Sequence, residues 1–114
     1  MEALCPSLEM LNLERNYIGT SHSSVSYKAL KKLNMLTLLS MSGNRLTSIH
    51  YDMFDMMTQL QYLNLSNNFL TALDIYQFQH NSLLTLVDFS QNRLQRFETS
   101  SISNMTSLQY LNLN

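Results

Sequence analysis

The sequence predicts an α/β solenoid: a horseshoe-like stack of short repeats with a concave parallel β-sheet and a convex side of short helical or irregular segments. The first observation is an eleven-residue pattern beginning at Leu60, LQYLNLSNNFL, with apolar residues at its first, fourth, sixth and last positions and Asn at its ninth. Complete copies also begin at Leu8, Leu36 and Leu84, and a shortened copy begins at Leu108. The last four copies start 24 residues apart. Four complete matches in such register are hard to obtain by chance.

The repeats divide the whole chain. Residues 1–7 are expected to be the tail of a preceding repeat, and the repeats that follow are 8–35, 36–59, 60–83 and 84–107, with residues 108–114 beginning a fifth. The surplus residues of the 28-residue first repeat fall in a polar stretch around Gly19, which is suited to a surface loop. Apolar residues three apart then predict a short convex helix over residues 26–33, with Ser26 as its N-cap.

The apolar positions predict how the repeats pack. Alternation at the fourth and sixth positions is typical of a short strand whose two apolar side chains point into the core, and only stacking on the next repeat can bury them. Phe54 and Phe78, continued by Ile102, are expected to form a spine under the convex side. Asn81 stands where an apolar residue is expected. Either it is hydrogen-bonded inside, or Leu83 turns inward in its place.

One asparagine recurs at the point where each strand ends and the chain bends. A side-chain amide offers two donors and an acceptor, so it can satisfy backbone groups of its own repeat and the next. Stacked copies would form a structural ladder across an otherwise unsatisfied buried turn. The predicted ladder comprises Asn16, Asn44, Asn68 and Asn92.

Residues between the inward-facing positions must face out of the concave sheet. One such column is apolar or aromatic in all five copies: Met10, Leu38, Tyr62, Leu86 and Tyr110. The neighbouring column is polar and includes Asn64 and Asp88. An apolar stripe beside a polar field is typical of a protein-binding surface with Tyr as anchors. The alternative is that neighbouring side chains half cover the stripe, which would then be structural.

Composition excludes several functional classes. The formal net charge is -1, so the chain has no electrostatic footprint for nucleic acid. No apolar run approaches the ~18 residues that span a bilayer, and no signal peptide is visible. Cys5 has no cysteine partner, and the three histidines lack the short spacing of metal ligands, so no metal or cofactor is expected. No nucleophile, base and oxyanion-donor set can be assembled, so we expect no enzyme activity.

Two N-glycosylation acceptor patterns are present, beginning at Asn64 and Asn104. Their number is about what chance predicts. Asn104 is the better candidate because it is expected on the convex side, whereas a glycan on Asn64 would obstruct the concave face.

The repeated pattern resembles the typical 24-residue class of leucine-rich repeats, and the segments at Leu60 and Leu84 look most like repeats of Toll and Toll-like receptor ectodomains. The resemblance covers residues 8–114. It implies an extracellular receptor ectodomain, with a part in innate immune signalling, that binds a protein or other macromolecule on its concave face. The alternatives are a matrix-type structural repeat protein and an accessory array of an enzyme whose catalytic domain lies elsewhere.

The sequence also departs from that family. His50, Asp74 and Glu98 occupy a position that is often Pro, so the convex turn is expected to differ. No cysteine clusters of the kind that cap extracellular arrays are present. Because uncapped stacks expose core and strand edges, the sequence predicts self-association through the ends.

Overall fold

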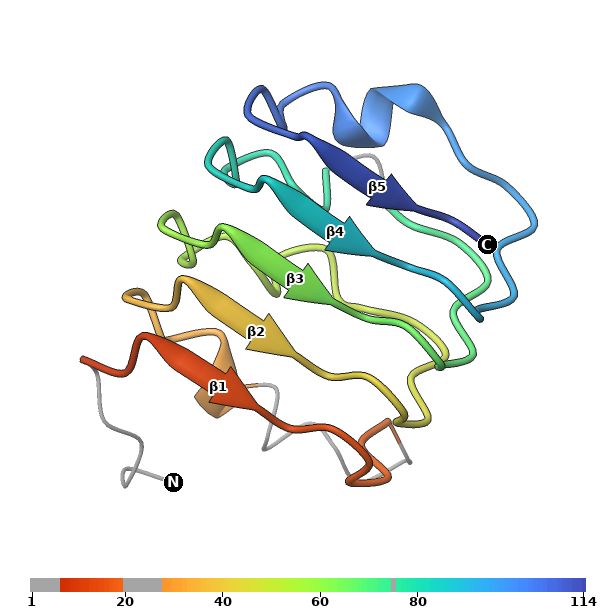
Figure 1. Cartoon of the computed structure of the whole chain (residues 1–114), viewed down its shortest axis with the longest axis horizontal. Coiled ribbons are helices and arrows are strands. Elements are labelled where there is room, and N and C mark those ends of the chain that lie inside the picture. The colour runs from red at the N-terminus through yellow and green to blue at the C-terminus, as the bar shows by residue number, and fades with distance from the viewer. Residues whose placement is uncertain (1–6, 20–27, 75) are drawn as a thin grey trace.

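The computed structural model describes residues 7–19, 28–74 and 76–114, so residues 1–6 of the predicted tail (1–7) and the predicted N-cap, Ser26, lie outside the described residues. Within the described part, five strands form one parallel sheet in the order β1-β2-β3-β4-β5 (Figure 1). The strands are β1 (Met10–Asn12), β2 (Leu38–Ser40), β3 (Tyr62–Asn64), β4 (Leu86–Asp88) and β5 (Tyr110–Asn112). Each falls at the same place in its copy of the pattern. The predicted solenoid is confirmed.

The register of the sheet follows the motif. Leu39 pairs with Leu63, and Leu63 with Val87, so equivalent positions of successive repeats are lateral neighbours. These three side chains are completely buried. The strands are short, but backbone bonding between repeats continues past them into the turn: the N–H of Met41 donates to the carbonyl of Asn64, and that of Leu65 to Asp88, each at 2.8 Å. Residues far apart in sequence therefore share one core.

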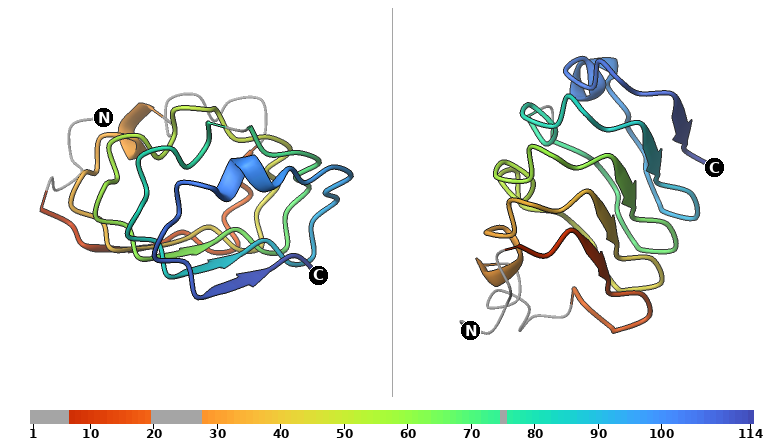
Figure 2. Two further views of the ribbon diagram at one scale, coloured as in Figure 1. Left: turned by 90° about the horizontal axis from the view of Figure 1, so that it is seen from above. Right: turned by 60° about the vertical axis from the view of Figure 1, so that its left-hand side comes forward.

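The convex side consists mainly of turns stacked behind the sheet (Figure 2). The only helices in the described residues are a 3-10 turn, η1 (Thr99–Ile102), and a helical stretch at residues 28–30, inside the predicted helix. The predicted spine is present, because the rings of Phe54 and Phe78 stack with centroids 5.5 Å apart and Ile102 packs against the core. Phe89, from the strand side, adds a third ring 5.9 Å from Phe78.

Asn81 takes the first of its two predicted arrangements. It is fully buried, and its Nδ2 donates to the carbonyls of Phe54 at 3.0 Å and Met57 at 2.9 Å. Leu83 stays 40% exposed and does not replace it. Asn81 thus ties two turns of the solenoid together, although its own Oδ1 is buried with no hydrogen-bond partner among the described residues.

The convex turns begin at the three residues that stand where the family often has proline. The backbone carbonyls of His50, Asp74 and Glu98 each accept a hydrogen bond from the N–H three residues later. The donors are Met53, Gln77 and Ser101, at 3.0, 3.0 and 2.9 Å. The same turn therefore forms in three repeats without the ring of proline.

Candidate partner-binding surface

The apolar column crosses the concave face in one line. Met10 pairs with Leu38, Leu38 with Tyr62, Tyr62 with Leu86, and Leu86 with Tyr110. The terminal members are exposed, with Met10 at 63% and Tyr110 at 51%. The three inner members are half-buried by their neighbours. The inner part of the column therefore contributes to packing, while its two terminal side chains remain exposed on the concave face.

The neighbouring polar column has a local structural role that the sequence analysis missed. The Asn64 side-chain oxygen accepts the N–H of Ser66 at 3.0 Å, and the Asp88 carboxylate accepts the N–H of Ser90 at 2.9 Å. Asn12 and Asn112 make the same bond to residues two positions on. This local turn holds the chain where it leaves each strand. Both side chains remain half-buried, so their contribution to binding would be limited to the polar atoms that the turn leaves unused.

Hydroxyl groups complete the polar field. Ser40, in the same column, bonds differently: its Oγ donates to the Glu14 carboxylate at 2.6 Å. Further along, the hydroxyls of Ser42 and Ser66 lie 2.9 Å apart. These contacts link adjacent repeats and fix the surface beside the apolar column.

The asparagine column runs under this field. The Asn68 Oδ1 accepts the N–H of Leu46 at 3.1 Å, and its Nδ2 donates to the carbonyls of Met41 at 3.0 Å and Leu65 at 3.1 Å. Asn44 and Asn92 bond in the same way, and Asn92 shares the carbonyl of Leu65. Each amide therefore reaches back to the preceding repeat. The expectation that it would reach the next repeat is wrong, because the partners of each amide outside its own repeat lie in the repeat before it.

Asn16 differs from the other three. It is exposed, and within the described residues its side chain makes one hydrogen bond, from Nδ2 to the carbonyl of Glu14 at 3.1 Å. The described part of the chain holds no strand before β1 that Asn16 could bridge to. Among the described residues it is the first rung of the column.

The residue before each of these asparagines adopts the left-handed backbone conformation. The φ angles are 57°, 71°, 56° and 56° at Arg15, Gly43, Asn67 and Gln91. Gly43 and Asn67 are residue types that favour this region, but Arg15 and Gln91 are not. The bend is therefore set by the stacked hydrogen bonds rather than by local preference, which is why sequence reasoning did not find it.

Other candidate residues lie on the convex side. Lys31 pairs with Asp52 at 3.3 Å, and Asp52 also contacts His50 at 2.6 Å. Asn104 is exposed and follows η1, so its amide is accessible for glycosylation, whereas Asn64 is half-buried and engaged in its turn. Nothing in residues 7–19, 28–74 and 76–114 groups three potential metal ligands. Over the same residues, no helix is long and apolar enough to cross a membrane.

Comparison with known proteins decides the family. A model of the leucine rich repeat matches residues 6–70 and 58–114. The chain belongs to the leucine-rich repeat family. Repeats of this family are in general scaffolds for protein–protein recognition, and they are typically non-catalytic. A search of curated proteins gave no match.

Two solved structures superpose closely on this leucine-rich repeat chain. The leucine-rich repeat domain of APL1B is 27% identical with a TM-score of 0.85, covering 95% of this chain and 31% of its own. A chain of the LRIM1/APL1C complex is 26% identical with a TM-score of 0.83, covering 96% and 20%. This chain thus spans about a third or less of their length. A chain of the Drosophila Toll–Spatzle complex, with 17% identity and a TM-score of 0.44 over 96% of this chain and 24% of its own, adds nothing to the assignment.

Proposed function

We propose that this chain is a segment of an extracellular receptor ectodomain that binds a protein partner on its concave face, through the column of Met10, Leu38, Tyr62, Leu86 and Tyr110. The observation that carries the proposal is the lateral register of these five side chains across the sheet. A partner laid across the strands could bury them together.

The chemistry of the column supports this role. Tyrosine supplies a large contact area at low cost in conformational entropy and is enriched at interface hot spots. The exposed Tyr110 and the half-buried Tyr62 lie on the same line, and the bonded polar residues beside them form a pre-ordered rim. Pre-ordering reduces the entropy that binding must otherwise cost.

Similarity to other members of the leucine-rich repeat family supports the receptor part of the proposal. One structure similar to this chain is of a protein in the LRIM1/APL1C complex, so a related array occurs in an assembly of two different proteins. The accessible Asn104 would carry a glycan away from the concave face. Asn64 and Asp88 would contribute to the contact only through the atoms that their turns leave free. Self-association through the ends of the stack remains a prediction, which sedimentation across a concentration series tests.

The first experiment finds the partner. A photo-reactive residue at Tyr110 should cross-link a protein of the extracellular fraction, and the same residue at the convex Tyr76 should not.

The second experiment measures the affinity of that protein for three chains: the parent, Tyr62→Ser/Tyr110→Ser, and the control Tyr51→Ser/Tyr76→Ser. The control removes two tyrosines that are 53% and 56% exposed on the convex side.

We expect the concave double variant to bind at least about tenfold more weakly, because truncation of interface anchors costs ~1–2 kcal/mol or more each. The convex variant should bind within about twofold of the parent, since its tyrosines lie outside the contact. Equal affinity of the concave variant and the parent, with an unchanged melting temperature, would reject the proposal. Loss of the fold in the concave variant would count against it too, by showing that the column is structural.

A further inference from the structure

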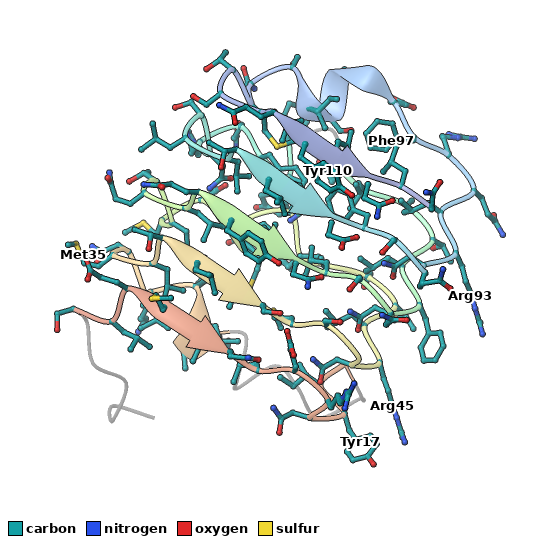
Figure 3. The ribbon with its side chains drawn as sticks, viewed as in Figure 1. Tyr17, Met35, Arg45, Arg93, Phe97 and Tyr110 are labelled. Atoms are coloured by element: carbon teal, nitrogen blue, oxygen red, sulfur yellow. The ribbon has the colours of Figure 1, made fainter. Side chains whose placement is uncertain are left out.

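A second surface lies along the edge of the solenoid beyond the carboxyl ends of the strands. In each repeat, one residue stands between the ladder asparagine and the next apolar position. Along the stack these residues alternate between aromatic and arginine: Tyr17, Arg45, Phe69 and Arg93. All four are exposed, and Figure 3 shows Tyr17, Arg45 and Arg93 at this edge, on the opposite side of the sheet from Met35. We call these four residues the Arg–aromatic edge.

The edge is held at the spacing of the sheet. The N–H of Arg45 donates to the carbonyl of Ile18, that of Phe69 to Leu46, and that of Arg93 to Leu70, each at 2.8 Å. The ladder asparagines fix the residues on either side, since Asn68 and Asn92 accept the N–H groups of Leu46 and Leu70. Successive members are therefore about 4.8 Å apart, as in a sheet.

Each arginine stacks on the aromatic ring of the preceding repeat. The guanidinium carbon of Arg45 lies 4.4 Å from the centre of the Tyr17 ring, and that of Arg93 lies 4.6 Å from the centre of the Phe69 ring. Stacking uses the face of the guanidinium and leaves the N–H groups along its rim for a bidentate acceptor. Neither guanidinium is in an ion pair within the described part of the chain. Both guanidinium groups are therefore held over a ring while they remain exposed to a ligand.

The positively charged residues of the chain are also distributed unevenly. All four arginines follow strands of the sheet, at positions 15, 45, 93 and 96, whereas all three lysines lie between Lys28 and Lys32. Among the eight residues that follow each of the first four strands (13–20, 41–48, 65–72 and 89–96), the single carboxylate is that of Glu14. It accepts a hydrogen bond from Ser40. This edge is therefore basic in a chain whose net charge is -1.

We propose that the Arg–aromatic edge binds an extended acidic segment of a partner protein through two carboxylates three residues apart. Arg45 and Arg93 are two repeats apart, about 9.6 Å at sheet spacing. Residues three apart in a polyproline II segment share a face and are separated by about 9.3 Å. One carboxylate would meet each guanidinium, and an apolar residue between them, such as proline, would lie against the exposed edge of the Phe69 ring. This site is separate from the concave column, so it goes beyond the function proposed above.

Two short proline-rich peptides of equal charge test the proposal, one with its glutamates three residues apart and one with them adjacent. Fluorescence anisotropy should show the spaced peptide binding at least about fivefold more tightly, because only it reaches both arginines. Arg45→Gln/Arg93→Gln should lower the affinity for the spaced peptide by about tenfold or more. The charge-matched control Lys28→Gln/Lys32→Gln should stay within about twofold. Arg45→Lys/Arg93→Lys should also lose several-fold, since lysine keeps the charge but not the planar fork.

The outcomes separate the proposal from its rivals. Equal affinity for the two peptides, or equal losses in the arginine and lysine variants, would overturn it in favour of non-specific attraction of anions. Tighter binding of heparin than of the spaced peptide, dependent on the same arginines, would overturn it in favour of a sulfated polysaccharide. The concave variant Tyr62→Ser/Tyr110→Ser should retain the spaced peptide, so failure of either proposal leaves the other to be judged separately.

Discussion

Asn68 and Asn16 occupy the same position in the third and first repeats, yet one is 3% exposed and the other lies at the surface. Asn68 holds the Leu46 N–H and shares the carbonyl of Met41 with Asn44 and that of Leu65 with Asn92. The Asn16 side chain donates to the carbonyl of Glu14, within its own repeat. The same motif position therefore contributes differently to stability in the two repeats, because the contribution depends on hydrogen bonds to the preceding repeat.

The largest expected effect therefore separates these two positions. Asn68→Ala should lower the free energy of unfolding by about 3 kcal/mol, because it leaves the buried Leu46 N–H unpaired and removes several hydrogen bonds. The carbonyls of Met41 and Leu65 limit the loss, since each keeps a second donor. Asn16→Ala should cost less than about 1 kcal/mol, since its group is exposed to water. Urea titration of both variants measures the difference, and equal losses would refute the role given to the neighbouring repeat.

A smaller difference in stability should distinguish the two glycines, Gly19 and Gly43, in the bends after the first two strands. Gly19 has φ 112°, and a Cβ there would lie 2.5 Å from backbone atoms of Arg45. Gly43 has φ 71°, and its Cβ would meet the flexible Arg15 side chain at 3.0 Å. We expect Gly19→Ala to cost about 2 kcal/mol and Gly43→Ala about 1 kcal/mol, because only the first clashes with backbone. Thermal unfolding checks this order, and a Gly43→Ala variant that loses more stability would contradict it.

The smallest effect concerns the concave column, where an inner member is again compared with a terminal one. Leu86→Ala should lower the free energy of unfolding by about 1 kcal/mol, since its side chain is partly packed between neighbours. Met10→Ala should change it by less than about 0.5 kcal/mol, because Met10 is 63% exposed. Denaturant midpoints of the two variants give the comparison. A larger loss at Met10 would show that the first repeat carries more packing than its exposure indicates.

Much of this architecture could be predicted from the sequence because the repeats share one period. The spacing of Leu39, Leu63 and Val87 fixed both the strands and their lateral order, and the spacing of Phe54 and Phe78 fixed the ring stack. The position of the asparagine in each bend could also be predicted, since turn backbone in a core needs polar partners.

The remaining features depend on contacts that one repeat does not contain. The turns at Asn64 and Asp88 could not be told from exposed polar positions, because alternation predicts only that both side chains leave the core. The left-handed backbone at Arg15 and Gln91 contradicts the preference of both residues and follows from the stacked bonds around them. The stacking of Arg45 on Tyr17 appears only when two bends lie side by side.

The most direct test of the lateral order is a disulfide across adjacent repeats. The hydroxyls of Ser42 and Ser66 lie 2.9 Å apart, in equivalent positions of neighbouring bends. Ser42→Cys/Ser66→Cys, in a chain with Cys5→Ser, should oxidise readily because neighbouring strand positions fall within the ~4.4–6.8 Å between Cα atoms that a disulfide requires. Ser42→Cys/Ser90→Cys, two repeats apart, should remain reduced under the same conditions. A bridge that forms equally well in both variants, or in the second alone, would contradict the stacked order of the repeats.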